Sequence, residues 1–209
     1  IDSTNIRAKL EAEQGAESGL LVVADQQTAG RGRRGRGWES PSGSNIYYTL
    51  MLKPDFNADC APMLTLVMAL AVAKGIRQTL GRGSEEGAAK VGIKWPNDIV
   101  VDGKKVCGIL TEMSMEQAYI HHIVIGVGIN VRRQEFPEEI RDRAAAIDEQ
   151  CGFRISRSQL IADIMEAFEE DYEIFLQTHD LKGLRDSYAK LLLNQDREVC
   201  VLDQQKLGI

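Results

Sequence analysis

The chain has 209 residues, of which 44% are apolar and 27% are charged, the balance of a globular protein rather than a disordered one. Its length allows one sizeable core with at most a small appendage, and its net charge of −6 argues against broad coating of nucleic acid. No apolar run reaches the roughly 20 residues of a membrane-spanning helix, and the longest, residues 63–76, contains Lys74.

The first part of the chain predicts two strands and one long helix. Residues 19–25 and 46–52 are short β-rich runs. Residues 62–80 have apolar side chains at helical spacing, with a proline at the start and a glycine after the end. Residues 81–89 are glycine-rich and predict a loop.

The middle of the chain predicts more strands. Residues 91–96 are a short β-rich run, and residues 98–113 predict a hairpin with an Asp-Gly turn at 102–103. A long β-rich run covers 118–131 and contains His121 and His122. Because side chains alternate along a strand, we expect these two rings to point to opposite faces, one packed and one in solvent. They would then be poor partners for one metal ion.

Helices dominate after residue 136. The sequence predicts helices over 136–147, over 156–177 with Ser156 as N-cap, and over about 180–193. Residues 197–203 predict a further strand. Helices mixed with hairpin-like strand pairs predict an α+β fold, with a mixed, mostly antiparallel sheet and helices packed on one side.

The chain divides into one large domain and a short remainder. We expect residues 1–195 to form the main domain. Since a lone strand is not a domain, residues 196–209 are expected to be the first, incomplete part of a small C-terminal β domain. The sequence QQK followed directly by LGI predicts missing residues after Lys206.

Residues 30–38, GRGRRGRGW, hold four glycines and four arginines between two predicted strands. They match the dinucleotide-binding pattern GxGxxG, but that pattern needs a helix directly afterwards, and a strand is predicted instead. A phosphate-binding Walker loop needs a following Gly-Lys-Ser/Thr, which is absent from the sequence. An RNA-binding tail is expected at a terminus or in repeats rather than between core strands.

An anion-binding loop that closes over its ligand fits this stretch better. Arginine carries a permanent charge on a planar fork of donors, and glycine allows close backbone approach and movement. A basic loop exposed to solvent stays the alternative reading.

Two other segments hold groups of the same kind. Residues 94–98, KWPND, and 102–110, DGKKVCGIL, bring Lys94 and Lys105 from adjacent strands, although each lysine could simply pair with a carboxylate or solvent. The glycines of GVGIN, 126–130, allow close approach by a ligand or another backbone. Fixed cations, amides and an indole together suit the joining of a carboxylate to the α-phosphate of ATP, in which two anions must meet and the product must be kept from water.

The segments STN (3–5), QTAGRGRRGRGW (27–38), KWPND (94–98), KKVCGIL (104–110) and GVGIN (126–130) closely resemble, in this order, the biotin protein ligases. The resemblance implies an ATP-dependent, AMP-forming ligase that makes biotinyl-5′-AMP from biotin and MgATP. The biotin would then pass to a lysine of a biotin carboxyl carrier domain of a biotin-dependent carboxylase.

The resemblance also implies site residues. Lys105 and Arg33 would be the catalytic groups, and Asp98 the candidate ligand of Mg²⁺. The nucleotide side would be formed by Trp38, Lys94, Asn97 and Asn130. The biotin side would be formed by Ser3, Thr4, Asn5, Gln27, Arg31, Gly32, Arg33, Lys105 and Gly108.

Other readings stay open. Lipoate- or octanoate-transferring enzymes share the fold, and a transcriptional repressor that senses the adenylate would need an upstream DNA-binding domain, which is also the only case in which DNA is a partner. A homodimer is also compatible with the resemblance. Four scattered cysteines without a CxxC motif, and no visible signal peptide, favour a cytoplasmic protein without membrane contacts.

Overall fold

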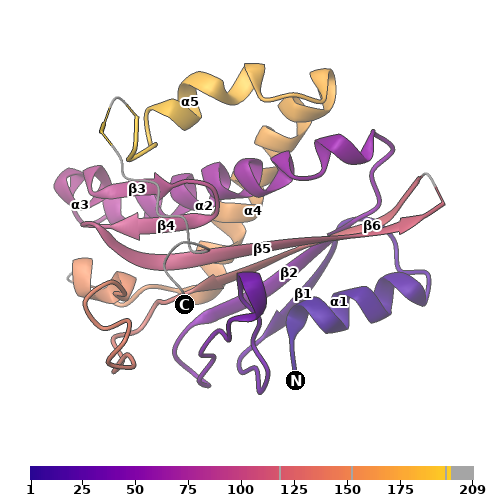
Figure 1. Ribbon diagram of the computed structural model, residues 1–209. Helices are drawn as coiled ribbons and strands as arrows, with labels where there is room; N and C mark the ends of the chain where they lie inside the picture. The colour runs from indigo at the N-terminus through magenta and orange to yellow at the C-terminus, as the bar shows by residue number, and fades with distance from the viewer. Residues whose placement is uncertain (118, 152, 196, 199–209) are drawn as a thin grey trace.

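One antiparallel sheet organises the molecule. The structure, a computed structural model, describes residues 1–117, 119–151, 153–195 and 197–198. Within them, six strands follow the order β1-β2-β6-β5-β4-β3, and helices cover both faces (Figure 1). The strands are β1 (Leu20–Ala24), β2 (Ile46–Leu52), β3 (Val91–Lys94), β4 (Asp98–Val101), β5 (Lys104–Glu116) and β6 (Tyr119–Ile129). The α-helices are α1 (Thr4–Glu13), α2 (Met63–Gly81), α3 (Glu85–Ala89), α4 (Arg157–Thr178) and α5 (Arg185–Ala189).

The α+β fold class predicted from the sequence is confirmed, and every paired strand of the described sheet is antiparallel. The predicted hairpin has its turn at Asp102 and Gly103, both with positive φ, as a two-residue hairpin turn of type I′ requires. Residues 196 and 199–209, most of the segment expected to begin a second β domain, lie outside the described residues, so that domain stays a prediction.

Three predicted elements differ in the structure. The helix predicted over 136–147 is wrong: the chain turns there, because its backbone bonds the strands instead, with Arg143 O accepting from Lys105 N at 2.7 Å. The loop predicted over 81–89 contains α3, whose N-cap Ser84 accepts a hydrogen bond from Gly87 N. The helix predicted over 180–193 is shorter, with a 3-10 turn (η4, Lys182–Leu184) running into α5.

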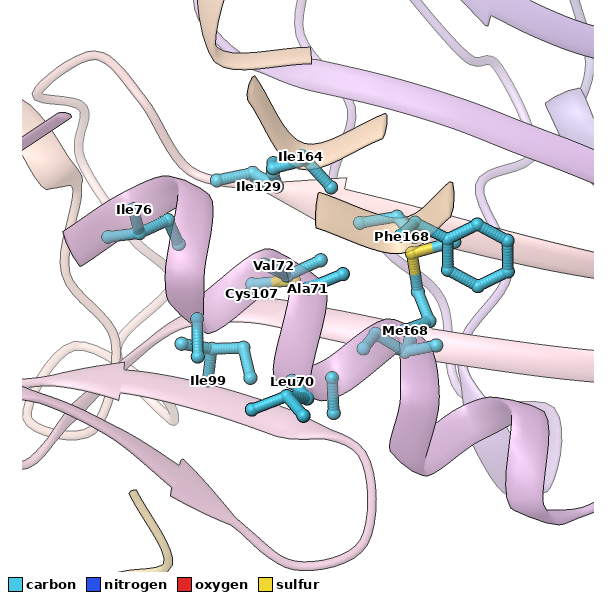
Figure 2. Packing of buried hydrophobic residues seen from close by; sticks show 14 of the residues in the cluster. Met68, Leu70, Ala71, Val72, Ile76, Ile99, Cys107, Ile129, Ile164 and Phe168 are labelled. Carbon is cyan, nitrogen blue, oxygen red and sulfur yellow. The ribbon is translucent and has the colours of Figure 1, made fainter. Parts of the chain in front are cut away.

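The main core lies between the sheet and the pair α2 and α4. Figure 2 shows Met68, Val72 and Ile76 of α2 packed between strand residues and the α4 side chains. A Cβ on Gly75 would come within 2.6 Å of Ile164 Cγ1, so this glycine allows α4 to lie close to α2. The helical run Ala58–Gly81 is long and apolar enough to span a membrane by composition, but 61% of its most apolar window is buried in this core.

The first helix packs on the opposite face of the sheet, below it in Figure 1. Ala8 and Ala12 of α1 meet Met51 of β2 and Val124 of β6 in a second, small cluster. Because alanines are small, the helix axis can approach the strands closely. The predicted placement of helices on one side therefore holds for α2 and α4, and α1 adds a helix on the other side.

A β-bulge near the turn between β5 and β6 changes where two histidines point. Ser114 pairs with His122 and Met115 with Ile120, which leaves His121 as the extra residue on β6. An extra residue interrupts the alternation of side chains along a strand. The prediction that His121 and His122 point to opposite faces is therefore wrong: their ring centroids lie 4.9 Å apart.

Candidate active site

Three glycines leave a strip of bare backbone on the face of the sheet that carries α1. Gly108 of β5 pairs directly with Gly128 of β6, and Gly126 pairs with Leu110. A Cβ on Gly126 would lie 2.0 Å from Asn5 Oδ1, and one on Gly128 would lie 2.5 Å from Trp38 Nε1. Other side chains thus occupy the space that side chains at these positions would need. We call this strip (Gly108, Gly126 and Gly128) the glycine floor.

The N-terminal turn of α1 stands at one edge of the glycine floor. Thr4 N donates to Gln27 Oε1 at 2.8 Å, which ties the helix to the segment after β1. The Thr49 hydroxyl lies 2.7 Å from Asn5 Oδ1, and Asn5 Nδ2 donates to Glu112 Oε2 at 2.9 Å. Ser3, Thr4 and Asn5 are all buried. The amide and hydroxyl groups of this turn are therefore held in fixed positions beside the floor.

The arginine/glycine loop, residues 30–38, folds back on itself above the floor. Trp38 N donates to Gly30 O at 2.9 Å, and the chain reverses at Arg34 and Gly35, both with positive φ. A short 3-10 turn (η1, Arg33–Gly35) lies among the glycines, and β2 rather than an α-helix follows them, so the structural context of a dinucleotide-binding turn is absent from this described segment.

Two arginines of the loop reach across the site. Arg33 Nη1 donates to Asn97 Oδ1 at 2.7 Å, and Arg31 Nη2 lies 3.5 Å from Glu112 Oε1. Both guanidinium groups are partly open to solvent, so these contacts contribute little stability. They are weak enough to be exchanged for contacts with an anionic ligand.

The Trp38 indole lies on the glycine floor. Its Cζ3 would be 2.9 Å from a Cβ on Gly108. The Lys105 ammonium group is 5.3 Å from the ring centroid, within the range of a cation–π contact, and it also pairs with Asp98 Oδ1 at 2.7 Å. The buried indole Nε1 has no hydrogen-bond acceptor among the described residues, which makes this position of the ring costly.

Glu112 is the carboxylate on the α1 side of the site. Burial by itself would raise the pKa of Glu112, but hydrogen bonds from Lys9 and Asn5 outweigh it, and the pKa is lowered. Lys9 Nζ lies 2.8 Å from Glu112 Oε1. The group is therefore an anion that holds surrounding donors, which is the role of a positioning residue rather than of a proton donor.

These groups enclose a cavity of about 50 Å³. A site for a small organic ligand usually measures hundreds of Å³. The Trp38 indole takes up part of the space, because it lies directly on Gly108 and Gly128. A ligand of that size on the glycine floor therefore requires the indole to move away.

A family model decides the wider assignment, since the biotin/lipoate A/B protein ligase family matches residues 1–130. The chain belongs to this family. Among curated relatives, the bifunctional ligase/repressor BirA of Bacillus subtilis is 41% identical over 194 residues, covering 90% of this chain and 57% of that protein. The biotin–[acetyl-CoA-carboxylase] ligase of Paracoccus denitrificans is 41% identical over 130 residues, covering 62% of this chain and 51% of that protein.

Solved structures agree with this family assignment. A biotin protein ligase from Aquifex aeolicus in complex with biotin and ATP superposes with a TM-score of 0.78 at 31% identity, covering 97% of this chain and 80% of that one. The ligase from Leishmania major in complex with biotin gives 0.74 at 26% identity, covering 97% and 82%. The chain spans about six tenths of the length of the curated BirA relatives that it matches.

Most residues that the family resemblance singled out surround one cavity. Three of them do not line this cavity: Lys94, Asp98 and Asn130. Lys94 is exposed, Asp98 pairs with Lys105, and the buried Asn130 donates to Ala145 O at 3.3 Å. The predicted residues that do line it are Ser3, Thr4, Asn5, Gln27, Arg31, Gly32, Arg33, Trp38, Asn97, Lys105 and Gly108. Their individual roles stay predictions.

Sequence reasoning missed five residues of the lining: Ile109, Leu110, Gly126, Val127 and Gly128. The glycines of GVGIN were interpreted as allowing close approach by a ligand or another backbone, but Gly126 and Gly128 were not included among the predicted site residues. The available signal was a period of two in the glycines of a strand, which puts Gly126 and Gly128 on one face.

Proposed function

We propose that this protein is a biotin ligase that joins biotin to ATP and then transfers it to a protein lysine. The observation that supports it most is the glycine floor, a strip of strand backbone without side chains of its own, in a cavity that Arg31, Arg33 and Lys105 also line. A flat ring system that carries an anion matches such a surface. The relatives described as biotin ligases, and the Aquifex structure described with biotin and ATP, support the same ligands.

The first half-reaction forms the adenylate. A carboxylate oxygen of biotin attacks the α-phosphorus of ATP, the bond to the bridging oxygen breaks, and pyrophosphate leaves. Both reactants are anions, so Lys105 at the floor would lower their repulsion and stabilise the charge that develops on the phosphate. The amide groups of Asn5 and Gln27 would hold the polar end of biotin beside α1.

In the second half-reaction, the amine of a carrier-protein lysine attacks the acyl carbon, and AMP leaves. Before that step the adenylate must be shielded from water. Loop 30–38 would do this once Trp38 has left the glycine floor and the loop has closed over the ligand. The indole would then cover the nucleotide instead of the bare backbone.

A magnesium ion would be held chiefly by the nucleotide phosphates. Magnesium usually takes one or two carboxylates together with phosphates. Glu112 is already bonded to Lys9 and Asn5. Among the described residues Asp98 pairs only with Lys105, which the phosphate could attract away. Asp98 fits the part of a single protein ligand, and the ion would supply charge neutralisation to the phosphates.

The test is a reaction of the full chain with biotin, MgATP and a purified biotin-accepting carrier domain. We expect one carrier lysine to gain the mass of biotin, with pyrophosphate released only when biotin is present. Lipoate and octanoate replace biotin in parallel reactions. Transfer of lipoate or octanoate but not biotin would contradict the proposal and assign the chain to the other branch of the family.

The acceptor and the compartment follow from the same proposal. Relatives named for acetyl-CoA carboxylase point to the carrier domain of a biotin-dependent carboxylase as acceptor. The described cysteines, Cys60, Cys107 and Cys151, are unpaired, which fits the reducing cytoplasm.

A further inference from the structure

A group of metal-binding side chains lies away from the candidate active site. Glu13 is the last residue of α1, and His121 and His122 lie on β6. One ligand atom from each of the three lies within 4.8 Å of the others. His122 lies four residues before Gly126 on β6, which places it about 13 Å from the glycine floor along the strand.

The fold brings these three side chains together in two ways. His122 shares by alternation the face of Val124, on which α1 packs, and the bulge at His121 brings the second ring to the same side. His121 Nδ1 lies 2.9 Å from His122 Nδ1. The packing of Ala8 and Ala12 on the sheet brings the end of α1 over the rings, and Glu13 Oε1 lies 3.8 Å from His121 Nδ1.

These separations are close to those of a metal site. Zinc binds imidazole nitrogen and carboxylate oxygen at about 2.0–2.2 Å in tetrahedral geometry, which sets neighbouring ligand atoms about 3.3 Å apart. The observed 2.9 Å and 3.8 Å lie on either side of this value. Small rotations of the exposed Glu13 side chain and the half-buried His121 ring would bring them to it.

We propose that Glu13, His121 and His122 bind one divalent transition-metal ion, with zinc as the ion to test. Two imidazoles and one carboxylate favour zinc or copper over magnesium or calcium, which prefer sites made of oxygen alone. In the empty site, one ring must donate its Nδ1 hydrogen to the other. Binding would move that hydrogen to the outer nitrogen, Nε2, and leave both Nδ1 lone pairs for the ion.

Two cations in the surroundings limit the affinity but do not occupy the site. Lys9 pairs with Glu112 at 2.8 Å, and Lys53 Nζ donates to Ala12 O at 3.4 Å. Their charges repel a metal ion, so we expect affinity in the micromolar range rather than the tighter binding of a structural site with four protein ligands.

The ion would join the end of α1 to β6. The opposite end of α1 carries Ser3, Thr4 and Asn5 at the candidate active site, so the ion would brace the helix that positions them. The metal is not needed for the proposed ligase chemistry, and the site is tested without biotin or ATP.

The experiment is a calorimetric titration of the full chain with zinc. We expect one zinc ion per chain, and a zinc affinity at least about 100-fold weaker for His121→Ala. Loss of even a residue that only hydrogen-bonds a metal ligand lowers metal affinity about 10–100-fold. Glu13→Gln should weaken binding as well, without a change in fold. The matched control is His179→Asn, which changes the remaining histidine of the chain and keeps a residue suited to its left-handed conformation.

Cobalt distinguishes this site from the thiols. A cobalt-loaded chain should show no thiolate charge-transfer absorption, and its visible spectrum should be lost in His121→Ala. Equal zinc affinity in wild type, His121→Ala and Glu13→Gln would overturn the proposal, and so would a cobalt spectrum dominated by thiolate. Neither result would bear on biotin transfer.

Discussion

Gly128→Ala isolates the contribution of the glycine floor. The added methyl group would lie 2.5 Å from Trp38 Cε2 and Nε1 and 3.0 Å from Cζ2. Ordinary carbon contacts are about 3.5–4.0 Å, so the indole must lift by about 1 Å or leave. A flat ligand on the same surface would meet the same obstruction.

The size of the effect follows from packing energies. Insertion of one methyl group into a tight contact costs about 1–3 kcal/mol. If the whole cost falls on the bound state, ligand affinity drops roughly 5- to 150-fold. The folded state should hardly change, because Trp38 belongs to a loop at the surface and alanine is favoured over glycine in a strand.

The assay is calorimetric binding of biotin and of ATP, together with a melting curve for each variant. Gly81→Ala is the control, because its new methyl group would meet only Ala88 Cβ at 3.7 Å, at the end of α2. Gly126→Ala is the contrast, because its methyl group would lie 2.0 Å from the buried Asn5 and should destabilise the fold. Unchanged binding of both ligands by Gly128→Ala would refute the role of the glycine floor.

Four further outcomes are expected. Lys105→Met should lower biotin-dependent pyrophosphate release by about 10²–10³ with an unchanged melting curve, and equal rates would exclude it from the chemistry. Lys74→Met should cost about 2–3 kcal/mol in urea unfolding, because it leaves the nearly fully buried Asp171 without its partner at 2.6 Å; a smaller loss would show that Asp171 finds water. Trypsin should cut loop 30–38 in the empty protein and cut it much more slowly with biotin and ATP. Equal cutting rates would show that the loop does not close. Because the pKa of Glu112 is lowered, the stability that its carboxylate contributes is present above its pKa in the unfolded chain and is lost as the pH falls through its pKa in the folded chain. Glu112→Gln should therefore reduce the acid dependence of the free energy of unfolding, and the same dependence in both proteins would contradict this.

The sequence predicted the strands and the long helices well because their apolar patterns are regular. It did not predict α1, because the side chains that α1 buries at Thr4, Ala8 and Ala12 are small or polar. They have helical spacing, but a hydrophobicity pattern does not detect them. Close packing of a helix on a sheet selects small residues, and this weakens the signal used to find helices.

The wrong helix over 136–147 has a different cause. Local pattern could not show that this segment runs beside the end of the sheet, where Ala145 N donates to Lys105 O at 3.0 Å and Ile147 N donates to Asn130 O at 3.0 Å. The same contacts explain Asn130, which was predicted on the nucleotide side. Its side chain is buried and donates to Ala145 O, so in this structure it holds the segment in place.

The resemblance named mostly polar and charged residues, whereas the strip that organises them consists of glycines. Gly108 and Gly128 lie opposite each other on β5 and β6, two inner strands of the sheet. A glycine in a strand weakens it by roughly 0.5–1 kcal/mol relative to alanine. Strand pairing across the sheet therefore decides which glycines act together. The resemblance named Gly108, but its pairing with Gly128 could not be recognised before the register was known. The two glycines therefore lower the stability of β5 and β6, and this loss is explained if their bare backbone is the surface that binds the ligand.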